Sequence, residues 1–505
     1  VIGYGAPSKS GKSDAHGATL RSAQRGAVRW ARIPVALAVV VLCVLAGTGC
    51  GQRYVLDGRA VSMRYDPFRV AGLPTTDGPS GPRVPLPGST ARVTNSDGGE
   101  IDRSALLAIE DIEDFWSQHY PEAFSGTFAP VQTLVSIDPS DPSSPAVCGA
   151  EAAELRYNAA YCRTRDVLAW DREYLLPVAN TFFGVMAVNG VLAHEYGHAV
   201  QVQARLVDAD TPTLIGEQQA DCLAGTYLRW VAEGHSPRFT LNTTGDLDRV
   251  IAGAIAMRDP ISVVRLLVPP SEAHGTALDR VSALQQGFDV GAEACAAIDF
   301  DDIEQRRGEL SSLLFHSGIP ASDLRITENT VKSLMEVLDV IFAPAAPPAL
   351  EVDQSGCPLP DGLPARYCPD SNTVSVDLAA LRRIGTPADE SQQVLLQGDN
   401  TALSVVVSRY VLAVQQERGV GLESGVAAMR TACLTGVAQH QMAERNDLAL
   451  TLGTGDLDEA VSGILTNGVV ASDVNGGVVP SGFTRISAFR SGLAGDVDDC
   501  FRRFP

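Results

Sequence analysis

The stretch Val191-Leu192-Ala193-His194-Glu195-Tyr196-Gly197-His198-Ala199-Val200 contains the pattern His-Glu-x-x-His within an otherwise apolar run. Residues four apart lie on one face of an α-helix, so the imidazoles of His194 and His198 can reach the same zinc ion. Glu195 projects beside that ion, where its carboxylate can take a proton from a zinc-bound water. The alternative is a buried helix with two hydrogen-bonded histidines. We favour a catalytic zinc site, because this spacing rarely arises by accident in a chain with 8 histidines.

A catalytic zinc needs a third protein ligand and keeps its fourth position open to water. Eighteen residues after His198 the chain reads Glu217-Gln218-Gln219-Ala220-Asp221, and Asp210-Thr211-Pro212 supplies the cap and first-turn proline of a new helix. Glu217 and Asp221 are four apart and share a face of that helix. We expect Glu217 to be the third ligand and Asp221 to accept the outer N–H of a zinc-bound histidine. The alternative is a solvated acidic helix face.

Further segments accompany these motifs: Gln219-Ala220-Asp221-Cys222-Leu223-Ala224-Gly225, His274-Gly275-Thr276 with Arg280, and Cys148-Gly149 followed by Tyr161-Cys162 and Asp171. With His194 to Gln201, they make the chain resemble the bacterial neutral zinc metallopeptidases over residues of about 101–300. The resemblance implies an exported or membrane-associated zincin with glutamate as the third zinc ligand. The chain departs from that pattern in its long Pro-rich segment before the module and in the sequence after it.

The N-terminal residues 1–52 have the order of an export signal. A basic stretch ends at Arg32, an apolar stretch runs from Ile33 to Gly47, and Thr48-Gly49-Cys50 follows. Three outcomes are open: cleavage, lipidation of Cys50, or retention as a single membrane anchor. We expect each to place the body outside the cytoplasm, attached to the cell membrane in the last two cases. Residues 53–100 are rich in Pro, Gly, Ser and Thr, which predicts a linker.

The charge of the chain is unevenly spread. The net charge is −21, although residues 1–52 carry six basic residues and one acid. The body is therefore strongly acidic and repels phosphate backbones, which argues against nucleic-acid binding. A hydrophobic fraction of 45% and a charged fraction of 20% are typical of a folded globular chain.

Parts of the sequence recur after 205 to 214 residues. Cys222-Leu223-Ala224-Gly225 parallels Cys433-Leu434-Thr435-Gly436, and Arg280-Val281-Ser282-Ala283 parallels Arg485-Ile486-Ser487-Ala488. We expect a zinc module at residues 101–310 and a second copy at residues 311–505, with chance similarity as the alternative. Eight cysteines remain beside Cys43 and Cys50, and an even number in an exported chain favours disulfides. Pairing within each copy predicts Cys148–Cys162, Cys222–Cys295, Cys357–Cys368 and Cys433–Cys500.

The second copy lacks the metal-binding residues of the first. Alignment of the copies puts Ser408, Arg409 and Leu412 in the places of the two histidines and the glutamate between them. Ala428 and Ala432 take the places of Glu217 and Asp221. We therefore expect the second copy to fold without binding zinc, so that the chain holds one Zn²⁺.

We predict an α+β fold that is mainly α-helical, with a small β-sheet and a zincin-like module in tandem duplication. Expected helices are Ser104–Gln118, Asn189–Arg205, Pro212–Glu233 and Ala402–Arg418, and expected strands are Gln132–Ile137, Val167–Trp170 and Thr373–Asp377.

The predicted function is zinc-dependent hydrolysis of a peptide or protein substrate, with Glu195 as general base and a gluzincin-like ligand set. The oxyanion donor is sought among His274, Tyr227 and Tyr161, and the His-Gly-Thr context favours His274. The alternative is a zinc-binding envelope scaffold with little or no turnover. In either case the second module is a candidate surface for a protein partner.

Overall fold

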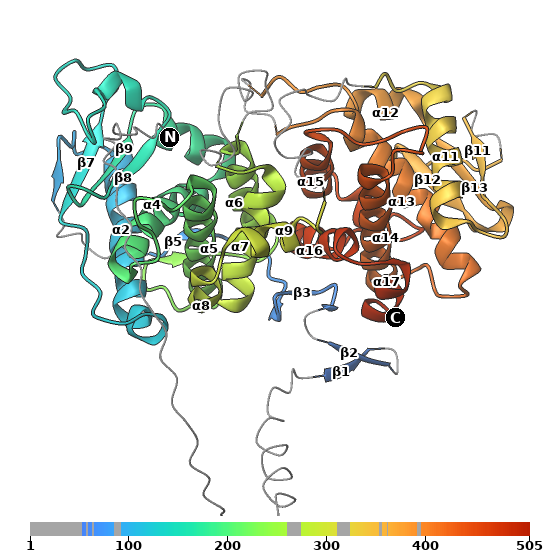
Figure 1. Cartoon of the computed structure of the whole chain (residues 1–505), viewed down its shortest axis with the longest axis horizontal. Helices are drawn as coiled ribbons and strands as arrows, with labels where there is room; N and C mark the ends of the chain where they lie inside the picture. Colours follow the sequence, from blue (N-terminus) through green and yellow to red (C-terminus); the bar gives the residue numbers. More distant parts are fainter. Residues whose placement is uncertain are drawn as a thin grey trace, which may run out of the picture. The chain divides into compact units, whose positions relative to one another are not determined.

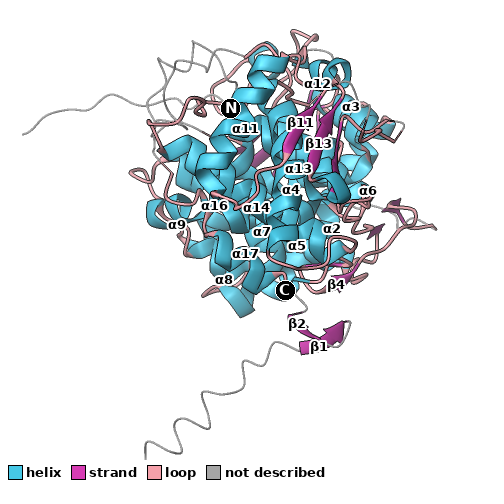
Figure 2. Cartoon of the chain, turned by 90° about the vertical axis from the view of Figure 1, so that its right-hand side faces the viewer, coloured by secondary structure: helices cyan, strands magenta, loops and turns pink. Residues whose placement is uncertain are grey.

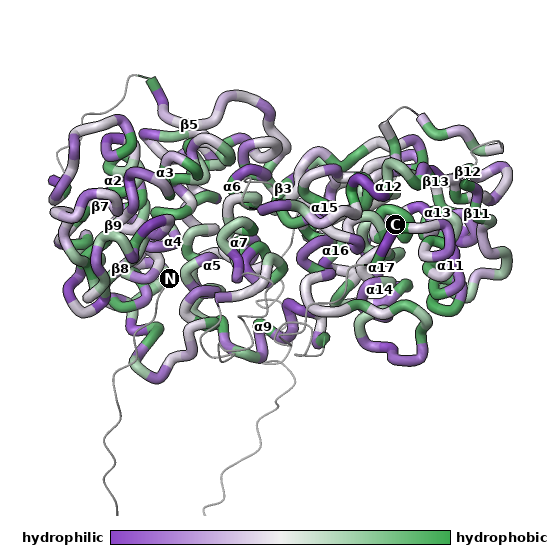
Figure 3. The backbone as a smooth tube through the Cα atoms, turned by 90° about the horizontal axis from the view of Figure 1, so that it is seen from above, coloured by the Kyte–Doolittle hydropathy of each residue, from purple (hydrophilic) through white to green (hydrophobic). Residues whose placement is uncertain are grey.

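The computed structural model describes residues 53–56, 59–62, 65–84, 92–259, 274–310, 324–352, 356–360, 362–390 and 395–505. The predicted signal segment and the lipidation candidate Cys50 lie outside these residues. No helix in the described part of the chain is long and apolar enough to cross a membrane. Hydrophobic and hydrophilic residues are mixed along its backbone (Figure 3). The choice among cleavage, lipidation and a membrane anchor stays a prediction.

The chain divides into two compact units, residues 1–63 and 64–505. In the first unit, β1 (Arg53–Leu56) and β2 (Arg59–Ser62) form an antiparallel hairpin. In the second unit, β3 (Arg69–Val70) pairs with β4 (Leu73–Pro74), and β5 (Gly81–Pro82) pairs with β10 (Phe239–Thr240). The predicted linker over residues 53–100 is therefore structured in part.

The first half of the second unit combines a small sheet with a group of helices (Figure 1). The sheet has the order β6-β7-β9-β8, from Val93–Thr94, Thr133–Ile137, Val167–Asp171 and Ala159–Cys162. β7 runs parallel to β9, and β8 pairs antiparallel with β9 and forms the edge. The helices are α2 (Glu100–Ala123), α3 (Leu175–Val178), α4 (Val185–Ala204), α5 (Thr213–Ala232), α6 (Gly245–Ala256), α7 (Ala277–Val290), α8 (Ala292–Ala296) and α9 (Phe300–Arg306).

The second half has a similar order of elements. Its sheet β11-β13-β12 consists of Ala349–Glu351, Thr373–Val376 and Ala365–Cys368, with one parallel and one antiparallel pair. This sheet packs against α13 (Figure 2). The helices are α11 (Glu328–Phe342), α12 (Leu378–Ile384), α13 (Asp399–Glu417), α14 (Gly425–Glu444), α15 (Asp456–Thr466), α16 (Gly482–Leu493) and α17 (Val497–Arg503). The predicted mainly helical α+β fold is confirmed, whereas the tandem duplication stays a prediction.

Glycines allow one pair of helices in each half to pack backbone against backbone. A Cβ atom at Gly287 of α7 would collide with the carbonyl oxygen of Cys222 in α5. A Cβ atom at Gly492 of α16 would collide in the same way with the carbonyl oxygen of Cys433 in α14. Since no larger residue fits at either place, both helix pairs depend on glycine at the crossing.

The two halves meet through reciprocal contacts between helix starts. The Asp248 carboxylate of α6 accepts a hydrogen bond from the Gly482 N–H of α16 at 2.7 Å. The Asp458 carboxylate of α15 accepts one from the Leu278 N–H of α7 at 3.3 Å. Each half thus holds the first turn of a helix in the other half. One hydrophobic core runs through both halves.

Three of the four predicted disulfides are present. Cys222–Cys295, Cys357–Cys368 and Cys433–Cys500 have Cα–Cα distances of 5.4, 5.9 and 5.7 Å. The predicted Cys148–Cys162 bond is wrong for this structure, because both cysteines are free. Desolvation and the neighbouring Cys162 thiol raise the pKa of Cys148 to about 12.

Candidate zinc site

Two helices position the predicted ligands. His194, Glu195 and His198 lie on α4, and Glu217 and Asp221 lie on α5. Between the two histidines, Gly197 faces α5 so closely that a Cβ atom would lie 3.1 Å from the Ala220 backbone. The small residue inside the motif therefore lets α5 bring its carboxylates to the histidine face of α4.

The three predicted ligands converge. Nε2 of His194 lies 3.1 Å from one Glu217 oxygen, and Nε2 of His198 lies 3.5 Å from the other. These donor atoms all lie within 4.8 Å of one another. A tetrahedral zinc with bonds near 2.1 Å separates its ligand atoms by about 3.4 Å. Two imidazole nitrogens and one carboxylate oxygen also match the donor types of a catalytic zinc site, so the residues fit the ion.

The outer nitrogen of each histidine is held by a different side chain. Nδ1 of His194 lies 2.7 Å from the Asp221 carboxylate, as the sequence predicted. Nδ1 of His198 lies 2.9 Å from the Gln201 amide oxygen. Both partners accept a hydrogen bond from the Nδ1–H group, which leaves the lone pair of each Nε2 directed toward the convergence point. Gln201 is a site residue that the sequence analysis missed, although it follows His198 by one helical turn.

Asp221 is itself fixed by Arg280 of α7. The Arg280 guanidinium donates to the two Asp221 oxygens at 2.7 and 3.0 Å and to the Met257 carbonyl at 2.8 Å. All three side chains of the chain Arg280–Asp221–His194 are buried. Although burial opposes a charge on the ring, the Asp221 and Glu217 carboxylates raise the pKa of His194 to about 10. The pocket thus attracts positive charge at the place where the donors meet.

Glu195 lies beside the convergence point without joining it. Its side chain is buried, and its carboxylate accepts a hydrogen bond of 3.1 Å from the Tyr161 backbone N–H of β8. Burial raises the pKa of Glu195 above that of an ordinary carboxyl group. A carboxylate with a raised pKa, oriented by the edge strand, is suited to accept a proton near neutral pH.

Of the three candidates for the oxyanion donor, the structure leaves one side chain available. The Tyr227 hydroxyl donates to Asp111 at 2.8 Å, and the Tyr161 hydroxyl donates to Asp166 at 2.9 Å. His274 is held by Asp259, which lies 3.2 Å from its Nδ1 and accepts from its backbone N–H at 2.8 Å. Nε2 of His274 is buried and has no hydrogen-bond partner among the described residues. Because Asp259 accepts from Nδ1, Nε2 can donate only when the ring carries both protons, so His274 is a candidate oxyanion donor in its imidazolium form.

The corresponding place in the second half is filled. Arg409, which aligns with Glu195, is buried and donates to the Ser408 hydroxyl at 3.1 Å and to the Val469 carbonyl at 2.9 Å. Leu412, Ala428 and Ala432 are fully buried and offer no metal ligand. Elsewhere in this half, the carboxylates of Asp399, Asp456 and Glu459 lie close together. That set contains no imidazole and does not correspond to the site on α4 and α5.

The comparisons with known proteins agree with the site. Residues 60–298 match the family described as "Putative neutral zinc metallopeptidase", which confirms the family expected from the motifs. The "Uncharacterized protein YpfJ" of Escherichia coli (strain K12), and the protein of that name from Escherichia coli O6:H1 (strain CFT073), are each 34% identical to this chain over 128 residues. The aligned segment covers 22% of this chain and 42% of either relative, so the chain spans less than half the length of these curated relatives. No solved structure matches the chain.

Proposed function

We propose that this chain, whose residues 60–298 match the neutral zinc metallopeptidase family, hydrolyses peptide bonds with a single zinc held by His194, His198 and Glu217. The observation that carries the proposal is the convergence of both Nε2 atoms on the Glu217 carboxylate, with each Nδ1 held from behind. Because the second half offers no such set at the corresponding place, one zinc per chain is expected.

Each residue has a part in this reaction. A bound zinc supplies Lewis-acid polarisation and a water of lowered pKa. Glu195, oriented by the Tyr161 N–H, accepts the proton of the attacking water and passes it to the leaving amine. His274, as an imidazolium that also donates from Nδ1 to Asp259, donates from Nε2 to the oxygen of the scissile carbonyl as negative charge develops there. Asp221 and Gln201 keep the two histidines in the tautomer that presents Nε2.

We propose that the backbone of the substrate binds along the edge strand β8. Among the strands in the described part of the chain, only β9 pairs with β8, which leaves the other edge of β8 open. An extended peptide can add to an open strand edge through main-chain hydrogen bonds. Since Tyr161 of β8 also holds Glu195, a peptide aligned on this strand would lie next to the general base.

We also propose that the chain works outside the cytoplasm, attached through its N-terminal segment. The basic and then apolar order of residues 1–52 supports export, and three disulfides in the body agree with an oxidising compartment. We propose that the second half is a degenerate copy of the zinc module. The order of helices, the glycine crossings and the disulfide from α14 to α17, which matches the one from α5 to α8, support this.

The test compares peptide-library cleavage and zinc content in four full-length proteins. Glu195→Gln should keep one zinc and lose about 10²- to 10⁴-fold in cleavage rate, as expected when a general base is removed. Glu217→Gln should lose both zinc and cleavage. Glu233→Gln makes the same chemical change on the same helix at an ion pair with Arg229, and it should behave as the wild type. Undiminished cleavage by Glu195→Gln contradicts the mechanism, and zinc binding without cleavage of any peptide supports the scaffold alternative.

A further inference from the structure

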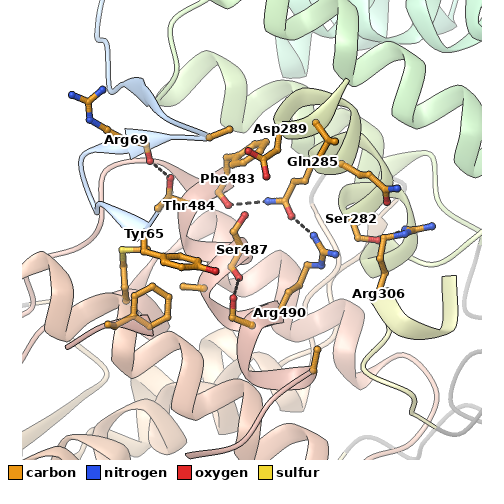
Figure 4. A pocket seen from close by; sticks show the side chains of 18 of the residues that line it. Tyr65, Arg69, Ser282, Gln285, Asp289, Arg306, Phe483, Thr484, Ser487 and Arg490 are labelled. Atoms are coloured by element: carbon orange, nitrogen blue, oxygen red, sulfur yellow. Dashed lines mark hydrogen bonds between the residues drawn. The ribbon is translucent and has the colours of Figure 1, made fainter. Parts of the chain in front are cut away.

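A cavity of about 340 Å³ lies between the two halves, away from the zinc site. Its walls come from α7 and α9 of the first half, from α16 of the second half, and from the segment around Tyr65 and Arg69 (Figure 4). Tyr65, Met429 and Phe504 form an apolar side, in which the rings of Tyr65 and Phe504 pack edge to face at 5.6 Å. Arg490, Gln285 and Ser282 lie on a polar side. The cavity has the size and the mixed lining of a small-molecule site.

Of the three arginines that line this cavity, Arg490 differs from the other two in its partner, which is a neutral amide. Arg69 pairs with Asp66 at 3.5 Å, and Arg306 pairs with Asp302 at 2.8 Å. Arg490 rises from α16 toward α7 and donates to the neutral Gln285 amide oxygen at 2.8 Å (Figure 4). No carboxylate in the described ranges lies within 4.0 Å of its guanidinium nitrogens. Asp289, the remaining charged group of the lining, has interactions of its own.

Two guanidinium N–H groups at this place lack an acceptor. Nε of Arg490 and Nη2 of Arg306 are buried and have no hydrogen-bond partner among the described residues. The Arg306 side chain is only 8% exposed, so water reaches it poorly. Burial and the nearby Arg306 lower the pKa of Arg490 to about 9. A buried donor without an acceptor is costly, and a buried charge without a partner is more so. The hydrogen-bond partner of the Arg490 guanidinium is thus a neutral amide, and an oxyanion in the cavity would supply the negative charge that Gln285 lacks.

We propose that this cavity binds a small organic monoanion, a carboxylate carried on an apolar or aromatic body. One negative charge matches the one arginine of the lining that has no carboxylate in contact among the described residues, and the planar guanidinium fork suits a carboxylate. The Tyr65, Met429 and Phe504 side would receive the apolar body. Because the walls belong to both halves, the ligand would bind them to each other. This binding does not depend on zinc. The second half would therefore contribute to ligand binding although it lacks the metal ligands.

The test is calorimetric titration of the zinc-loaded full chain with phenylacetate, with neutral phenylacetamide and with inorganic phosphate. Phenylacetate should bind with a Kd of about 1 mM or tighter, and phenylacetamide at least about tenfold more weakly, because charge-assisted hydrogen bonds to arginine are lost. Arg490→Gln should abolish the binding. This variant introduces the residue that the first half has at the matching position, Gln285. Arg418→Gln, at an exposed pair on α13, should leave the binding unchanged.

A second variant tests whether Arg490→Gln loses binding only because the protein no longer folds. Ser487→Leu fills the cavity from α16 without changing any charge, and it should also prevent binding. Phenylacetate that binds Arg490→Gln as tightly as the wild type overturns the proposal, since it would then occupy another place such as the zinc. Absence of phenylacetate binding up to about 10 mM, or tighter binding of phosphate than of phenylacetate, overturns it as well.

Discussion

Replacement of Asp221 by asparagine tests how the buried chain behind His194 works. The Asp221 carboxylate accepts hydrogen bonds from His194 at 2.7 Å and from Arg280 at 2.7 and 3.0 Å. An asparagine has the same shape but presents an NH₂ group toward one of these donors, and it leaves the buried Arg280 without a counter-charge. We expect zinc affinity to fall about 10- to 100-fold, as for other partners of zinc-bound histidines. Folding stability without zinc should fall by about 3–5 kcal/mol, as when a buried ion pair loses one member.

The assays are zinc competition against a chromophoric chelator and thermal unfolding of the zinc-free chain. A double-mutant cycle with Arg280→Gln should give a coupling free energy of about 1–3 kcal/mol, because the two residues act through one contact. Asp248→Asn is the matched control, since Asp248 pairs with Arg485 at 3.2 Å between the halves and lies away from zinc. The reasoning is refuted if Asp221→Asn binds zinc within about twofold of the wild type, or if its effect adds independently to that of Arg280→Gln.

Three further outcomes are expected. Burial raises the pKa of Glu113 to about 7, so its contribution to stability is present below its unfolded value of 4.5 and is lost as the pH rises through 7. At pH 8, Glu113→Gln should therefore raise the melting temperature and increase the free energy of unfolding by at most about 3 kcal/mol, and at pH 4 it should change neither. An equal increase at pH 4 and pH 8 would contradict an origin in the raised pKa of Glu113. Gln201→Ala should weaken zinc binding about 3- to 10-fold in the same competition assay, less than Asp221→Asn, because a neutral hydrogen bond is lost; no change would show that Gln201 does not orient His198. Replacing both Cys222 and Cys295 by serine should lower the free energy of unfolding in denaturant by about 2–5 kcal/mol, whereas Cys148→Ser, which removes a free thiol, should change it little; equal losses would mean that Cys148 is bonded after all.

The sequence predicts the zinc ligands because residues four apart in a helix lie on the same face, so their spacing in the sequence indicates which side chains can meet. His194 and His198 share a face of α4, and Glu217 and Asp221 share a face of α5. The close approach of the two helices at Gly197 was not predicted, because it depends on packing between segments that the sequence does not relate.

Gln201 and Arg280 escaped the sequence analysis for a different reason. Each has a matching residue in the second half, Gln415 and Arg485, although that half lacks the zinc ligands, so the match gave no sign of a role at the metal. There Gln415 contacts Arg430 and Thr431, and Arg485 donates mainly to backbone carbonyls. The same residue types thus serve packing in one half and orient metal ligands in the other. The Cys148–Cys162 prediction failed because the spacing of cysteines does not distinguish a bonded pair from two free thiols.

The most direct measurement loads the full chain and its Glu217→Gln variant with zinc, removes unbound zinc by dialysis, and compares the zinc content of the two proteins. The account predicts close to one equivalent of zinc in the wild type and a small fraction of that in the variant, because two imidazoles alone hold zinc weakly. One full equivalent in both proteins would show that the ion lies elsewhere, and two equivalents in the wild type would show that the second half still binds it.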